Sequence, residues 1–177
     1  MAAMLKESAV AALLIGCCGS QPLVQAQAHS QLSVSAPEQR VHLTFMLDGE
    51  SRKELESSLS DCRPVEVRYV AELRKERMLW PDLAFARTTV RNRATCDHAT
   101  RRQTLQRMVD GSIVASTIET DRTAVLAFMA GTGDIAAFQG VKFPSYSYSV
   151  RVKSVLVTAP DRARETGVLA EARFEIR

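Results

Sequence analysis

Arginine is the residue whose type and spacing in this 177-residue sequence point most directly to chemistry. Five arginines share the polar sides of two neighbouring segments in which polar and apolar residues alternate, and alternate side chains of a strand lie on one face of a sheet. They are Arg68, Arg74, Arg87, Arg91 and Arg93. Guanidinium groups bind phosphate and carboxylate through paired hydrogen bonds, so this basic patch could hold lipid head groups or an acidic protein. Glu66 and Glu72 interleave with the arginines, and a solvated face with cross-strand ion pairs is the alternative.

The sequence contains no motif that combines a nucleophile with an acid and a base. Asp97-His98 resembles half of a catalytic triad, but no GxSxG or other nucleophile motif accompanies it, and a loop Asp-His is usually a turn with a solvated imidazole. Metal-binding spacings such as HExxH and CxxC are also absent. Gly131-Thr132-Gly133 follows an expected helix, so it indicates a helix end and not a phosphate-binding loop. We therefore expect no catalytic residue, no cofactor and no metal.

Residues 1–28 predict an export signal, because residues 9–18 form an apolar run of signal-peptide length that is too short to span a bilayer. Two processing sites compete. Cleavage before Cys17, which ends a lipobox-like Leu-Ile-Gly-Cys, would leave that cysteine to carry a lipid. Ordinary cleavage near Ala26 or Ala28 would instead release a soluble periplasmic protein. A buried N-terminal helix is the third alternative.

The rest of the chain predicts one β-rich domain over residues 41–177, with residues 29–40 as a flexible tether before it. About seven segments alternate apolar and polar residues, two short segments have helical spacing, and Asp110-Gly111 is a strong hairpin signal. Because strands and helices do not alternate along the chain, a parallel sheet is not expected. The predicted fold is an antiparallel, β-sandwich-like domain with two short helices.

Cys62 and Cys96 are the two cysteines that remain once the leader is excluded. The predicted strands over 65–96 form a hairpin that turns near Trp80-Pro81, which brings the two cysteines close to opposition at the same end of the ladder. Disulfides persist in the oxidising compartments to which exported proteins go. A register offset of a few residues could still separate them, so a disulfide and two buried free thiols both remain open.

Several segments resemble a known family when they are taken together. They are residues 41–47, the helix over 54–59, Arg63-Pro64-Val65, residues 72–77, Trp80-Pro81-Asp82, the turn at Asp97, and residues 148–153. Their order resembles the bacterial envelope family known as domain-of-unknown-function family 4390, over roughly residues 40–160. The resemblance implies an exported protein or lipoprotein without an established activity, and it supplies no functional residues. Cys62 and Cys96 depart from the family pattern, which has Gly and an aromatic residue there.

The net charge of +3 is too small to predict nucleic-acid binding, and outside the leader no apolar stretch is long enough to cross a membrane. Membrane contact would then come only through a lipid anchor. We predict a non-catalytic binding module in the periplasm, or lipid-anchored to the outer membrane, of a Gram-negative bacterium. Its partner would be an unknown envelope protein or lipid head groups. A structural subunit of an envelope assembly is the alternative, and an enzyme with a site near Asp97-His98 is a weaker one.

Overall fold

The computed structural model describes residues 31–36, 40–47, 49–77, 79, 83–159 and 162–176. Their elements are β1 (Gln31–Ser35), β2 (Val41–Met46), α1 (Gly49–Ser60), β3 (Val65–Lys75), β4 (Leu83–Cys96), β5 (Gln103–Val109), β6 (Ser112–Glu119), α2 (Arg122–Ala130), β7 (Ile135–Ala137), β8 (Tyr146–Ala159) and β9 (Arg162–Ile176). They form a three-stranded sheet of order β1-β2-β7 and a six-stranded sheet of order β6-β5-β4-β3-β8-β9. Every strand pair is antiparallel, so the predicted sandwich-like fold class is confirmed.

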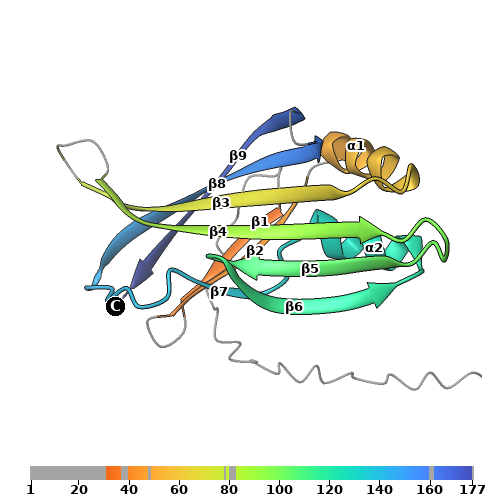
Figure 1. Cartoon of the computed structure of the whole chain (residues 1–177). Coiled ribbons are helices and arrows are strands. Elements are labelled where there is room, and N and C mark those ends of the chain that lie inside the picture. The colour runs from red at the N-terminus through yellow and green to blue at the C-terminus, as the bar shows by residue number, and fades with distance from the viewer. Residues whose placement is uncertain are drawn as a thin grey trace, which may run out of the picture.

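The six-stranded sheet lies in front of β1, β2 and α2 in the view of Figure 1, and the core fills the space between these layers. α2 contacts β4, β5 and β6, while β1 contacts β9 and α1 contacts both α2 and β3. Phe45 of β2 meets Tyr69 of β3 edge to face, with ring centroids 5.3 Å apart. One face of the six-stranded sheet is therefore covered by the small sheet and α2. We call this the inner face and the opposite one the outer face.

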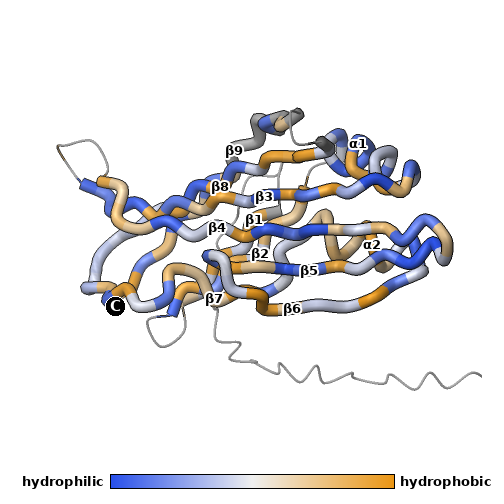
Figure 2. The backbone as a smooth tube through the Cα atoms, viewed as in Figure 1, coloured by the Kyte–Doolittle hydropathy of each residue, from blue (hydrophilic) through white to orange (hydrophobic). Residues whose placement is uncertain are grey.

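Strict alternation along β3 explains why this strand separates the two faces. Its odd-numbered residues from Val65 to Leu73 are buried in the core, and the even-numbered residues between them are only partly buried. Because successive side chains of a strand point to opposite faces, the charged residues at these even positions, Glu66, Arg68, Glu72 and Arg74, lie on the outer face. Figure 2 shows the same alternation of hydrophobic and hydrophilic residues along β3, β4 and β8.

The hairpin predicted at Asp110-Gly111 joins β5 to β6 and is confirmed. Both residues have positive φ, 48° and 90°, as the two central residues of a type I′ turn require. The Asp110 carboxylate also accepts a hydrogen bond from the backbone N–H of Thr89 at 2.7 Å. The turn is thereby fastened to β4.

Two expectations about the strands are wrong. The tether over 29–40 contains β1, in which Leu32 and Val34 alternate with polar residues and pair with Phe45 and Leu43 of β2, so that their apolar side chains pack on the core. The described residues also form nine strands instead of seven, because β1 was assigned to the tether and the three residues of β7 are too few to show a period. The leader, with Cys17, Ala26 and Ala28, and the turn at Trp80-Pro81 lie outside the described residues.

Neither of the two helices that the structure describes is long and apolar enough to cross a membrane.

Candidate functional site

The five arginines of the predicted basic patch all lie on the outer face of the six-stranded sheet. Register places Arg68 directly opposite Arg91, and it places Arg87 and Arg93 opposite carboxylates of β3. Arg74 follows a β-bulge near the far end of β3. The three arginines of β4 are exposed, whereas the two of β3 are partly buried. The sequence pattern therefore located one continuous charged surface.

Ion pairs divide this patch into two groups. Nη2 of Arg68 donates to Glu66 at 2.9 Å, and both Nε and Nη2 of Arg74 donate to Oε2 of Glu72, at 3.2 and 3.1 Å. For these two arginines the ion-paired alternative holds, although the pairs lie within one strand and not across strands. By contrast, the side chains of Arg87, Arg91 and Arg93 have no hydrogen bond or ion pair to any residue that the structure describes.

An open hollow of about 330 Å³ lies on the outer face where β4, β3 and β8 run side by side. Its lining is Val70, Glu72, Arg74, Arg87, Arg151 and Lys153. Glu72 pairs by register with Arg87 on one side and with Arg151 on the other. Val70 pairs with Lys153. The hollow thus collects basic side chains from the consecutive strands β3 and β4 and from β8, which lies far from both in the sequence.

Arg151 and Lys153 were missed by the sequence analysis, although a signal for them existed. The alternation of buried Tyr148, Val150 and Val152 places Arg151 and Lys153 on the opposite, outer side of the same strand. Only the pairing of β8 with β3 brings them next to the arginine patch. That pairing joins segments about 80 residues apart, and no local pattern predicts it.

The charges lining the hollow are unevenly paired. Among the described residues Glu72 is the single carboxylate of the lining, and Arg74 donates to it. Nε of Arg151 donates to Oε2 of Glu171 at 3.0 Å. Arg87 and Lys153 have no partner among the described residues. A fork of guanidinium donors beside a free ammonium can bind an oxyanion, and the lining residues that the structure describes include no Ser, Cys or His to act as a nucleophile or base.

A different arginine, Arg107 of β5, points to the inner face and meets the carboxyl end of α2. Its Nη2 donates to the carbonyls of Phe128 and Gly131, each at 2.9 Å, and its Nε donates to Oδ1 of Asn92 at 2.9 Å. The guanidinium also lies 4.5 Å from the centroid of the Phe128 ring. Burial lowers the pKa of Arg107 from its ordinary value, but an arginine remains charged at neutral pH.

Asn92 and Tyr69 complete this cap on α2. Asn92, which is fully buried, donates through Nδ2 to the carbonyls of Phe128, Met129 and Gly131 at 2.7–3.2 Å. The Tyr69 hydroxyl donates to the carbonyl of Met129 at 2.8 Å. The last carbonyls of a helix lack partners within the helix and carry partial negative charge, and α2 has no basic residue in its own last turn. The sheet supplies the missing donors and the missing cation.

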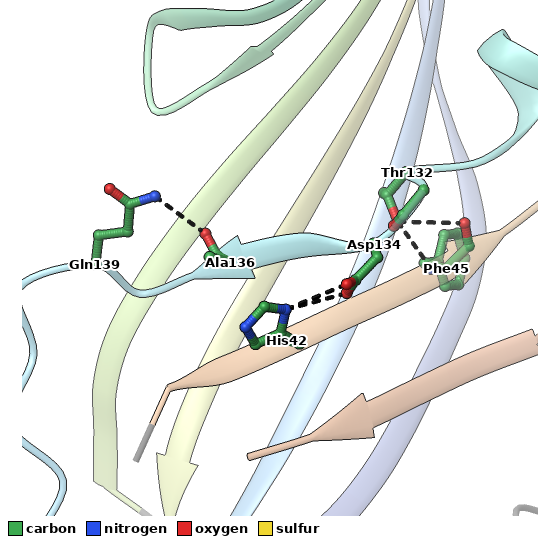
Figure 3. Close-up of polar contacts among 7 residues, drawn as sticks. His42, Phe45, Thr132, Asp134, Ala136 and Gln139 are labelled. Atoms are coloured by element: carbon green, nitrogen blue, oxygen red, sulfur yellow. Dashed lines mark hydrogen bonds and ion pairs between the residues drawn. The ribbon is translucent and has the colours of Figure 1, made fainter. Parts of the chain in front are cut away.

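Among the described residues, His42 forms a contact that the sequence did not reveal. Nδ1 of His42 donates to the Asp134 carboxylate at 3.2 Å, linking β2 to the residue before β7 (Figure 3). Thr132 lies nearby, but its Oγ1 accepts from the backbone N–H of Phe45 at 2.9 Å and points to the backbone instead of to the histidine. The pair joins residues 92 positions apart, so local sequence carries no sign of it.

Asp97 and His98 lie in the turn between β4 and β5. The Asp97 carboxylate accepts hydrogen bonds from Oγ1 of Thr100 at 2.7 Å and from the backbone N–H of Ala99 at 2.9 Å. These bonds, led by that from Thr100, hold the pKa of Asp97 below its ordinary value. The carboxylate is thus used to shape its own turn, and both side chains are exposed.

Cys62 and Cys96 form a disulfide, with Cα atoms 5.3 Å apart, so the bridged alternative is the one that the structure contains. Cys62 follows α1, and its backbone N–H donates to the carbonyl of Leu59 at 3.2 Å. Its φ of 55° lies in the left-handed region, where chains often turn after a helix. The bridge therefore ties the end of α1 to the end of β4.

No protein-family model, curated protein or solved structure matches this chain. Among the residues that the structure describes, no three His, Cys, Asp or Glu side chains are grouped to hold a metal ion. The function must therefore be argued from the surface of the chain itself, and the outer face of the six-stranded sheet is its most distinctive feature.

Proposed function

We propose that this chain is an exported, non-catalytic binding module of the cell envelope, and that the outer face of its six-stranded sheet is the binding surface. The observation that carries the proposal is that Arg87, Arg91 and Arg93 are exposed on one strand and have no acidic partner in the described ranges. Arginine is enriched at protein interfaces because it forms several directed hydrogen bonds to an anionic group. Arginines that the fold leaves unpaired are available to a partner.

Export is supported by the apolar leader and by the disulfide between Cys62 and Cys96, because disulfides persist in oxidising compartments and are rare in the cytosol. Attachment through a lipid on Cys17 and release by cleavage near Ala26 or Ala28 are the two forms that the proposal allows. Membership in domain-of-unknown-function family 4390 stays a prediction, and the proposal does not depend on it.

Fractionation of cells that express the full chain tests export. We expect the protein in the periplasmic or membrane fraction, without free thiols at Cys62 and Cys96 after alkylation under denaturing, non-reducing conditions. A fatty-acid probe that labels the wild type but not the Cys17→Ser variant would select the lipoprotein form. A cytosolic protein that keeps its leader and two free thiols would refute export.

Position-specific photo-crosslinking in intact cells tests the binding surface. A photoreactive amino acid replaces Arg91 on the outer face or, as the control, Arg52, which is exposed on α1. We expect a discrete adduct from position 91 and none from position 52. Equal adducts at both positions, or none at position 91, would contradict a binding role for the outer face.

A structural subunit of an envelope assembly is the second candidate, and β6 is the observation that favours it. This strand is one edge of the six-stranded sheet, and it exposes Ile113, Val114 and Ile118 by 59, 54 and 63%. It contains neither Lys nor Pro, the residues that commonly prevent edge strands from pairing with another chain. If β6 joins a strand of another subunit, light scattering should report an oligomer that Ile118→Lys dissociates. A monomeric wild type would remove this support.

A further inference from the structure

We propose that the hollow between β4, β3 and β8 is a binding site for a phosphoryl group, with Arg87 and Lys153 as its principal ligands. The inference rests on the proposed function, since it names the ligand class of the same outer face. It adds a location, because only two of the five arginines of the predicted patch, Arg74 and Arg87, line the hollow.

The behaviour of Glu72 is the first argument. This carboxylate lies between Arg87 and Arg151 in the register of the sheet, where a cross-strand ion pair to either neighbour would be expected. Its Oε2 instead accepts both hydrogen bonds from Arg74 of its own strand. Glu72 is thus hydrogen-bonded to Arg74 and not to the cations on the two flanking strands. Those cations remain available to another anion.

The number of free donors is the second argument. Arg87 and Lys153 have no partner among the described residues, and the contact of Arg151 with Glu171 uses only its Nε. Donors therefore remain on two strands that flank β3 from opposite sides. One anion that contacts all of them needs several acceptor oxygens. A phosphate monoester has three non-bridging oxygens, whereas a phosphodiester or a carboxylate has two.

Charge balance points to the same ligand class. Four cations and one carboxylate line the hollow, which leaves three positive charges in excess. Glu171 outside the lining offsets one of them through Arg151, so two remain. A phosphate monoester carries close to two negative charges at neutral pH, and a phosphodiester carries one. A phosphate monoester thus matches the excess, and a phosphodiester leaves one positive charge uncompensated.

The shape of the hollow accommodates such a group together with a small substituent. Its volume of about 330 Å³ lies at the lower end of the range for ligand sites. Val70 contributes an apolar residue to its lining, and the hollow opens on the outer side of the sheet. A free phosphorylated molecule and a lipid head group can both present a phosphoryl group to such an opening.

Binding measurements on the protein as isolated from cells test the proposal with two probes at constant ionic strength. The first is inorganic phosphate, titrated by calorimetry. The second is a set of phosphatidylcholine vesicles with and without phosphatidylglycerol, analysed by co-sedimentation. The variants are Arg87→Gln, Lys153→Gln and the double variant. Arg91→Gln is the matched control, because Arg91 is exposed on the same strand and face but does not line the hollow.

We expect each single variant to weaken binding at least about tenfold and the double variant to abolish it, while Arg91→Gln changes it less than about twofold. Binding of inorganic phosphate would indicate a free phosphorylated ligand. Binding only to phosphatidylglycerol vesicles would indicate a lipid head group. Either result, with this pattern of variants, supports the site.

The proposal is overturned if the wild type binds neither probe, or if the double variant binds as the wild type does. It is also overturned if Arg91→Gln weakens binding as much as Arg87→Gln, because the attraction would then depend on net charge alone. In each of these cases an adduct from position 91 in cells would still support the outer face as a binding surface. The failure of the site is thereby distinguished from the failure of the proposed function.

Discussion

Arg107 and Arg87 lie on opposite faces of the same sheet, and the sheet uses them in opposite ways. Arg107 donates to three acceptors on the inner face, two of them carbonyls at the end of α2. Arg87, on the outer face, has no partner among the described residues and lines an open hollow. The residue type is the same. The face to which each side chain points decides whether the arginine stabilises the fold or is free to bind a ligand.

This contrast separates stability from binding. A guanidinium such as that of Arg107, whose Nε and Nη2 donate to the fold, cannot turn to a ligand without leaving helix carbonyls unpaired. A guanidinium without partners contributes little to stability, since exposed charges are well solvated. Substitutions on the inner face should therefore reduce the free energy of unfolding, and those on the outer face should reduce only binding. The predictions that follow test this separation, beginning with the largest expected effect.

Asn92→Ala should be the most damaging of these substitutions. Asn92 is fully buried, donates to two carbonyls of α2 and to that of Gly131, which follows α2, and accepts from Nε of Arg107. Its loss leaves buried polar groups without partners, so we expect urea unfolding to show a loss of about 3–5 kcal/mol. A loss below about 1 kcal/mol would mean that the cap on α2 does not depend on Asn92.

Arg107→Met and Arg87→Met make the comparison directly, since both keep an unbranched side chain and remove one charge. Arg107→Met should cost about 2–4 kcal/mol, because it removes three charge-assisted hydrogen bonds from a partly buried site. Arg87→Met should change the free energy of unfolding by less than about 0.5 kcal/mol. Equal losses of unfolding free energy in the two variants would contradict the assignment of different roles to the two faces.

Gly133→Ala should disturb the inner face without replacing a charged residue. A Cβ at this position would lie 2.6 Å from Nη1 of Arg107, and the φ of Gly133 is +64°, which a β-carbon disfavours. We expect a loss of about 1–3 kcal/mol, measured by urea unfolding. Gly140→Ala is the control, since it shares a positive φ of 77° but has open space around it. A loss in the control that equals or exceeds that of Gly133→Ala would show that backbone strain, and not the contact with Arg107, destabilises the variant.

Tyr69→Phe should have the smallest effect at neutral pH, about 1 kcal/mol, from the lost hydrogen bond to Met129. Burial raises the pKa of Tyr69 above its ordinary value of 10.0. The folded state then retains a proton that the unfolded chain releases above about pH 10, so the wild type should lose stability as pH rises beyond that value. Tyr69→Phe should reduce this alkaline loss, as followed by urea unfolding between pH 8 and about 11. An unchanged pH dependence would contradict the burial of an un-ionised Tyr69.

The alternation of apolar and polar residues along single strands made much of the fold predictable. The buried residues of β3 and the Asp110-Gly111 turn follow from period and turn chemistry, and both are found. β1 escaped prediction because its sequence, QLSVS, has only two apolar residues and adjoins the leader. Its burial depends on pairing with β2, a tertiary effect that overrides local composition.

The candidate site was predictable in part. Spacing placed Arg87 on the outer face, but it could not separate an ion-paired arginine such as Arg74 from a free one, because side-chain partners are chosen in three dimensions. Lys153 needed the pairing of β8 with β3. The inner-face network was missed although Asn92 is in phase with the buried Val90 and Ala94, since polar residues in strands are usually taken to face solvent.

Urea unfolding with and without inorganic phosphate tests the central distinction most directly, when it is applied to the wild type, Arg107→Met and the Arg87→Gln/Lys153→Gln double variant. At about ten times the dissociation constant, phosphate should stabilise the wild type by about 1.4 kcal/mol. Arg107→Met should be destabilised without phosphate and still gain this increment. The double variant should unfold as the wild type does without phosphate and gain nothing from it. A double variant that is itself unstable, or that phosphate still stabilises, would contradict the assignment of Arg107 to the fold and of Arg87 and Lys153 to a ligand.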